Sequence, residues 1–144
     1  MRRSRRQPSS RFSPVAWDEL FQVFIISHLV GDYLLQTEWQ AVNKRGGLGG
    51  RPEQRRALGS HVATYTLAFA PALAGLWDSL HARVFGLAAL IAIPHLIQDD
   101  GRLLSRYAEV VKKADIQENQ GLGGALDQSL HLVALFLTAR LVAR

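Results

Sequence analysis

Residues 62–77 read VATYTLAFAPALAGLW, and this uncharged run decides what kind of fold the chain can adopt. A helix built from it has no polar face to turn toward water, so it belongs in lipid or in a large protein interior. A chain of 144 residues offers no interior of that size. The run therefore favours a membrane-spanning helix, which Pro71 is expected to kink.

Three further apolar segments accompany this run, and each is long enough to form a helix. The expected helices cover residues 15–37, 53–77, 83–106 and 122–142. None reaches about 20 unbroken apolar residues, the length that crosses a bilayer, unless its His and Asp side chains face the bundle interior. We therefore expect an all-α fold, a four-helix transmembrane bundle over residues 15–144, in preference to a soluble four-helix bundle.

Residues 1–14, MRRSRRQPSSRFSP, differ in composition from the rest of the chain. Five arginines and few apolar residues predict a disordered basic arm. A cleaved signal peptide is the alternative. It is disfavoured because Asp18, Glu19 and Gln22 interrupt the apolar region and no small-residue cleavage site follows Ile26.

The charge balance and the lack of cysteine limit the partners and the sites available. The net charge is +5, but the basic residues flank apolar segments, so membrane lipid is the expected partner and nucleic acid is not. This pattern predicts a multi-pass protein of the cell membrane. Without cysteine there is neither a disulfide nor a thiolate metal site, so any metal must use imidazole, carboxylate or water.

Four of the five histidines lie near one end of an apolar segment. The pairs are His28 with Asp32, His95 with Asp99, and Asp127 with His131, while His61 has Tyr65 at the fourth place. Residues four apart stand on one face of a helix. Successive membrane helices alternate in direction. The polar residues lie near the end of the first and third helices and near the start of the second and fourth, so all four sets are expected at the same depth in the membrane. We expect a polar His/Asp layer near one membrane face.

This layer predicts a metal site. The predicted ligands are His28, Asp32, His61, His95, Asp99, Asp127 and His131. Such a set suits one or two divalent ions, and without sulfur it favours Zn, Fe or Mn. A structural polar network or a proton relay is the alternative. Tyr65, Thr64 and Gln36 are expected to hydrogen-bond the ligands, Asp100 to be solvated, and His81 to lie on the surface.

Several of these motifs together resemble a known family. They are HLVGDYLLQTEWQAVNK at 28–44, His61 with Tyr65-Thr66-Leu67, His95 with Asp99, and DQSLH at 127–131. The chain resembles, over roughly residues 17–142, the DUF3307 family of small bacterial and phage-borne integral membrane proteins without an assigned activity. The resemblance implies a membrane fold but no reaction. The family often has a lysine three residues beyond the third motif's aspartate, where this chain has Arg102.

Three functions are compatible with the sequence. The first is a metal-dependent membrane hydrolase of a lipid or lipid-linked substrate, with Asp32, Asp99 or Asp127 as general base. Basic residues that could attract its anionic head group are Lys44, Arg102, Lys112 and Lys113. The second is a metal or proton transporter, or a sensor subunit. The third is a membrane partner protein whose polar layer only fixes helix packing.

Overall fold

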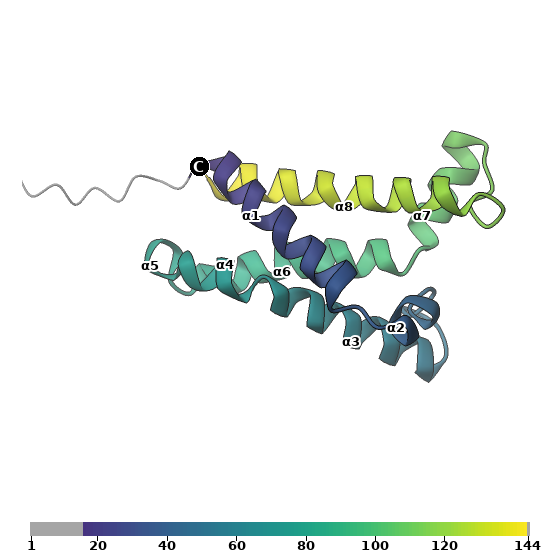
Figure 1. Ribbon diagram of the computed structural model, residues 1–144, viewed down its shortest axis with the longest axis horizontal. Coiled ribbons are helices and arrows are strands. Elements are labelled where there is room, and N and C mark those ends of the chain that lie inside the picture. Colours follow the sequence, from purple (N-terminus) through teal and green to yellow (C-terminus); the bar gives the residue numbers. More distant parts are fainter. Residues whose placement is uncertain (1–15, 144) are drawn as a thin grey trace, which may run out of the picture.

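The computed structural model describes residues 16–143, and every regular element in that range is helical. Figure 1 shows the long helices running beside one another along the molecule, with shorter helices gathered at their ends. The all-α prediction is confirmed. The predicted basic arm, residues 1–14, lies outside the described residues.

The first long segment is shorter than the predicted helix over 15–37. Helix α1, Trp17–Leu29, continues into η1, Val30–Leu34, a π-helical turn that ends before Thr37. Thr37 begins a new helix instead, α2 (Glu38–Asn43), because its hydroxyl accepts from the Gln40 backbone N–H while the Gln40 side chain accepts from the Thr37 N–H.

The second segment is broken where Pro71 was expected to kink it. Helix α3, Pro52–Ala68, ends at Phe69, and α4, Ala70–Gly75, and α5, Trp77–Leu80, follow. Proline has no N–H to donate to the carbonyl four residues earlier, and its ring clashes with that carbonyl. The helix therefore restarts with Pro71 in the first turn of α4.

The third predicted helix, 83–106, is divided in two. Helix α6, Arg83–Asp99, ends at Asp100, and Gly101 adopts a φ of 78° before α7, Arg102–Tyr107. A left-handed residue cannot continue an α-helix, and glycine adopts it without steric cost. Helix α7 runs into η2, Ala108–Lys112, and the last helix is α8, Gln120–Val142.

The long helices enclose an apolar core. Helix α6 packs against both α3 and α8, and α1 packs across α8 and α3. The buried core residues are Leu20, Phe24, Tyr65, Phe69, Leu76, Val84, Leu87, Ile91, Leu135 and Ala139. These positions fill the half of the bundle away from the 35–51 and 100–119 connections, so polar residues are left to the other half.

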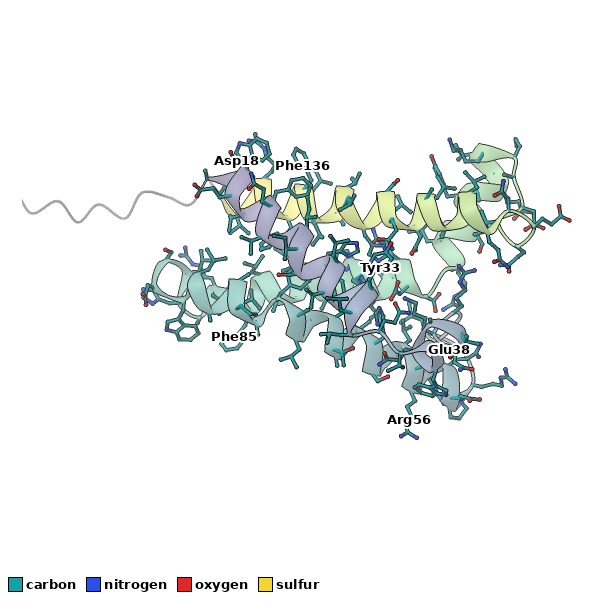
Figure 2. The ribbon with its side chains drawn as sticks, viewed as in Figure 1. Asp18, Tyr33, Glu38, Arg56, Phe85 and Phe136 are labelled. Carbon is teal, nitrogen blue, oxygen red and sulfur yellow. The ribbon has the colours of Figure 1, made fainter. Side chains whose placement is uncertain are left out.

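The outer surface of the bundle carries many large apolar side chains. Leu67, Phe85 and Ile26 are 68%, 70% and 63% exposed. In Figure 2 the charged Asp18 lies at one end of the bundle, with Glu38 and Arg56 at the other. Among the described helices, α8 is long and apolar enough to cross a membrane. The fold is thus a helical bundle with one helix of membrane-spanning length, and the four-span arrangement stays a prediction.

Candidate metal centre

The polar half of the bundle interior is a buried cluster of histidines and aspartates. It consists of His28 from α1, Asp32 from η1, His61 from α3, His95 and Asp99 from α6, and His131 from α8. Each of these side chains is at most 5% exposed. The prediction that the histidines of the four segments meet is confirmed, and their common depth in a membrane stays a prediction.

Two histidine nitrogens and two aspartate oxygens within the cluster lie close to one another. His61 Nε2 lies 3.1 Å from His95 Nε2, 3.3 Å from Asp32 Oδ1 and 2.8 Å from Asp99 Oδ2. His95 Nε2 lies 3.6 Å from the same Asp32 oxygen and 3.2 Å from the same Asp99 oxygen. Ligand atoms about 2.0–2.2 Å from a tetrahedral ion lie about 3.3–3.6 Å from one another. Each of the two carboxylate oxygens therefore lies, with the two imidazole nitrogens, at about the spacing of ligands around one ion.

His131 directs toward Asp99 a ring nitrogen that has no hydrogen-bond partner in the described part of the chain. Its Nδ1 lies 2.8 Å from the backbone carbonyl of Asp127, which can only accept, so Nδ1 carries a proton. In the neutral ring Nε2 is then an acceptor, and it faces Asp99 Oδ1 at 3.6 Å without a hydrogen-bond partner among the described residues. Two acceptors held face to face require a proton or a metal ion between them.

Tyr65 orients two of the histidines. Its ring stacks on the imidazole of His95, with centroids 3.3 Å apart and an interplanar angle of 3°. Its hydroxyl lies 3.2 Å from His28 Nδ1, while His28 Nε2 lies 3.0 Å from the amide oxygen of Gln128. Because Gln128 accepts from Nε2, the Tyr65 hydroxyl donates to Nδ1. The prediction that Tyr65 supports the cluster by hydrogen bonding agrees with these contacts.

His28 and Asp127, both predicted ligands, lie at the margin of the cluster. The two groups with metal-ligand spacing contain Asp32, His61 and His95, and His95, Asp99 and His131. Both nitrogens of His28 already have partners, and its Nδ1 lies 3.4 Å from Asp32 Oδ2. The side chain of Asp127 is 25% exposed, and its Oδ2 lies 3.9 Å from His131 Nδ1. Ligand and catalytic roles for all seven residues stay predictions.

Thr64, Gln36 and His81, which the sequence analysis also named, lie outside the cluster. The Thr64 hydroxyl donates to carbonyls of its own helix, at Ser60 and His61, and does not reach the cluster. The Gln36 amide donates to the Asp32 backbone carbonyl and accepts from Lys44. His81 is exposed, as expected, in a turn with a φ of 48°.

Lys44 is a member of the cluster that the sequence did not reveal. Its Nζ lies 2.8 Å from Asp99 Oδ2, and its side chain is only 13% exposed. The sequence indicated Lys44 only as a basic residue that could attract an anionic head group. The turn at residues 35–37 and helix α2 carry it back over the cluster, and no local pattern predicts such a reversal.

Asp100 was expected to be solvated, and this expectation is wrong. The residue is 4% exposed, and its carboxylate accepts from the Arg102 guanidinium and from the Leu48 backbone N–H at 2.8 Å. Its backbone carbonyl accepts from Gly46 N–H at 2.8 Å. Burial raises the pKa of Asp100, but the hydrogen bonds and charge of Arg102 outweigh it and hold the pKa below its usual range. Asp100 thus ties the 46–48 connection to the end of α6.

Comparison with known proteins gives one match. Residues 20–143 match the family model described as "Protein of unknown function (DUF3307)". Neither a curated protein nor a solved structure matches the chain.

Proposed function

The chain belongs to the DUF3307 family, and we propose that it is a multi-pass membrane protein that binds a divalent metal ion and hydrolyses a lipid or lipid-linked substrate. The proposal comes from the chain's own residues, because the family description names no activity. Zn, Mn and Fe are the ions that its histidine and carboxylate ligands favour.

One observation carries the proposal. Five separations among His61 Nε2, His95 Nε2, Asp32 Oδ1 and Asp99 Oδ2 fall between 2.8 and 3.6 Å, with every side chain buried. Two carboxylates and two imidazoles brought this close in a low-dielectric interior repel or compete for protons. A divalent cation would neutralise both carboxylates and accept both nitrogen lone pairs.

The surrounding residues suit hydrolysis. A bound ion of this type lowers the pKa of a water ligand and polarises the bond that is cleaved. His131 is placed to accept the proton of that water, because the Asp127 carbonyl fixes its tautomer with the Nε2 lone pair toward the cluster. Asp127, which is partly exposed, lies behind His131 and could pass the proton to solvent.

The exposed apolar surface supports a multi-pass arrangement. Large apolar side chains are exposed on the long helices, as Leu67 on α3 and Phe85 on α6 illustrate. A lipid bilayer would cover these side chains, whereas water would leave them exposed. The polar ends of the bundle in Figure 2 would then lie at the two membrane faces.

The interior argues against the two alternative functions. A transmembrane relay needs polar groups along its whole length, but beyond Tyr65 the described interior is an apolar core that includes Phe24, Phe69 and Leu87. In a purely structural polar network, each buried polar atom should have a hydrogen-bond partner. Here Asp32 Oδ1 and His131 Nε2 have no hydrogen-bond partner among residues 16–143.

The test is metal-dependent turnover of detergent-purified protein on phospholipids and lipid-linked phosphates. A chelator should abolish turnover, and adding back Zn, Mn or Fe should restore it. Asp99→Asn should be inactive, while His81→Ala, which removes an exposed histidine outside the cluster, should keep full activity. An equal turnover rate with and without the chelator would refute the role of the metal. No turnover on any of these substrates by metal-loaded protein would refute the hydrolase.

A further inference from the structure

We infer that Lys44 holds an anionic phosphate group of the substrate beside the metal, so that the substrate class is a phosphorylated one. The inference rests on the proposed metal centre and specifies what that centre acts on. It starts from a largely buried lysine ammonium that contacts an aspartate of the His/Asp cluster.

The first step is the position of the ammonium. Lys44 Nζ lies 2.8 Å from Asp99 Oδ2, the same oxygen that approaches His61 Nε2 and His95 Nε2. An ion bound through this oxygen would lie about 2.1 Å from it, and so within about 5 Å of Nζ. A phosphate coordinated to the ion could therefore place a second oxygen against Lys44.

The second step is the change in charge when the ion binds. Without an ion, Asp99 has Lys44 as its cationic partner. A divalent ion would neutralise Asp99 and Asp32 directly, and the Lys44 charge would then lack an anion. A partly buried ammonium without a counter-ion is costly, and a phosphate oxygen supplies one.

The third step is access. The cluster side chains are at most 5% exposed, whereas Lys44, in contact with Asp99, is 13% exposed and so more open to solvent. The Gln36 amide accepts from Lys44 and donates to the Asp32 carbonyl, which holds the lysine over the cluster. A substrate group that reaches the ion from this side passes Lys44.

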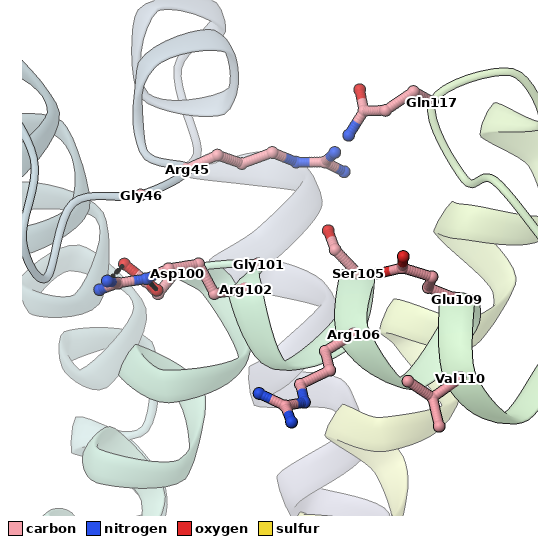
Figure 3. A pocket seen from close by; sticks show the side chains of 10 residues that line it. All are labelled: Arg45, Gly46, Asp100, Gly101, Arg102, Ser105, Arg106, Glu109, Val110 and Gln117. Atoms are coloured by element: carbon pink, nitrogen blue, oxygen red, sulfur yellow. Dashed lines mark hydrogen bonds and ion pairs between the residues drawn. The ribbon is translucent and has the colours of Figure 1, made fainter.

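The fourth step is the charge around this approach. A surface pocket of about 630 Å³ has Arg45 and Asp100 among its lining residues, and these directly follow Lys44 and Asp99 in the chain. Figure 3 shows Arg45 reaching across it toward Gln117, and Arg102 turned to Asp100. Arg45 and Arg106 have no ion-pair partner among the described residues, and Glu109 is the remaining acid in the lining. Excess positive charge here would attract an anion.

The experiment uses inorganic phosphate and Mn²⁺ with full-length protein in detergent. Manganese titration by calorimetry is the first measurement, and broadening of the phosphate ³¹P resonance by bound Mn²⁺ is the second. Lys44→Met and Lys44→Gln should bind Mn²⁺ at least as tightly as the unmodified chain. Both should lose phosphate affinity by roughly tenfold or more, as expected for one charged hydrogen bond. Arg83→Met, which removes an exposed cation at the start of α6, the opposite end of that helix from Asp99, is the control and should behave as wild type.

The outcomes separate this inference from the proposed function. If the wild type does not bind Mn²⁺, the metal centre fails and this inference fails with it. If Mn²⁺ binds, and phosphate binds equally well with and without Lys44, only the role of Lys44 is overturned. Absence of phosphate binding to the Mn²⁺-loaded wild type also overturns it.

A competition arm identifies the source of the phosphate. Phosphatidic acid in detergent micelles and soluble glycerol phosphate both present a phosphomonoester. For a lipid substrate, phosphatidic acid should displace inorganic phosphate at a lower concentration than glycerol phosphate does. This displacement should depend on Lys44. The reverse order supports a soluble phosphomonoester and retains the phosphate class.

Discussion

Gly31 directly precedes the cluster residue Asp32 in η1, and its replacement by alanine should damage the fold and the metal centre together. A Cβ added there would lie 2.6 Å from Tyr65 Cδ2 and 3.2 Å from the backbone Tyr65 Cα. The ring could turn, but the backbone of α3 cannot move away cheaply. Tyr65 also stacks on His95 and donates to His28, so its displacement disturbs both histidines.

The expected magnitude follows from two opposing effects. Overpacking a buried site costs about 1–3 kcal/mol, whereas replacing a helical glycine by alanine gains about 0.5–1 kcal/mol. Gly31→Ala should therefore lower the free energy of unfolding by about 1–2 kcal/mol, a fall of several degrees in Tm. Metal affinity should weaken by roughly tenfold or more, as for loss of a group that orients a ligand.

The assay is thermal unfolding in detergent with and without added ion, together with a metal titration. Gly59→Ala is the matched control, because Gly59 is also helical and nothing lies within 4 Å of its added Cβ. It should be neutral or slightly stabilising and should leave metal affinity unchanged. If Gly31→Ala is tolerated as well as Gly59→Ala, the close packing of η1 on Tyr65 is wrong.

Three further predictions concern single contacts. Tyr65→Phe keeps the ring stacked on His95 but removes the hydroxyl from His28, so calorimetry should show weaker metal binding and the free energy of unfolding should fall by about 1 kcal/mol. Unchanged metal affinity would argue against this supporting role of the hydroxyl. The lowered pKa of Asp100 stabilises the fold at neutral pH, and this contribution disappears as the pH falls below about 4, so Asp100→Asn should lower Tm more at pH 7 than at pH 3. An equal fall at both would contradict that charge effect. Cysteines introduced at Gly49 and Asn119 should label from the same membrane side, and opposite sidedness would end the four-span model.

The sequence predicted the parts of the fold that depend on long-range patterning. The uncharged run at 62–77 and the recurring His and Asp positions were sufficient to predict helices whose polar ends meet. The end of each helix was less predictable, because Thr37 and Gly101 interrupt apolar patterns through local capping and a positive φ. Sequence spacing also gives no angle between helices.

The candidate site shows the same division. Spacing of four residues along a helix placed His95 and Asp99 together correctly. It could not tell that Asp127 lies partly outside while Lys44, from a different helix and a reversed connection, lies inside. Burial of Asp100 was missed because its partners, Leu48 and Arg102, are brought to it by the loop and the helix break.

The central claim is that the buried cluster binds a divalent ion, and metal analysis of the protein as purified from cells tests it most directly. We predict stoichiometric Zn, Mn or Fe in the unmodified protein and in His81→Ala, and its loss from His61→Ala and Asp99→Asn. Chelation should lower Tm, since an ion that binds only the folded state stabilises it. Folded protein without stoichiometric metal, and with a Tm that neither chelator nor added ions change, would contradict the claim.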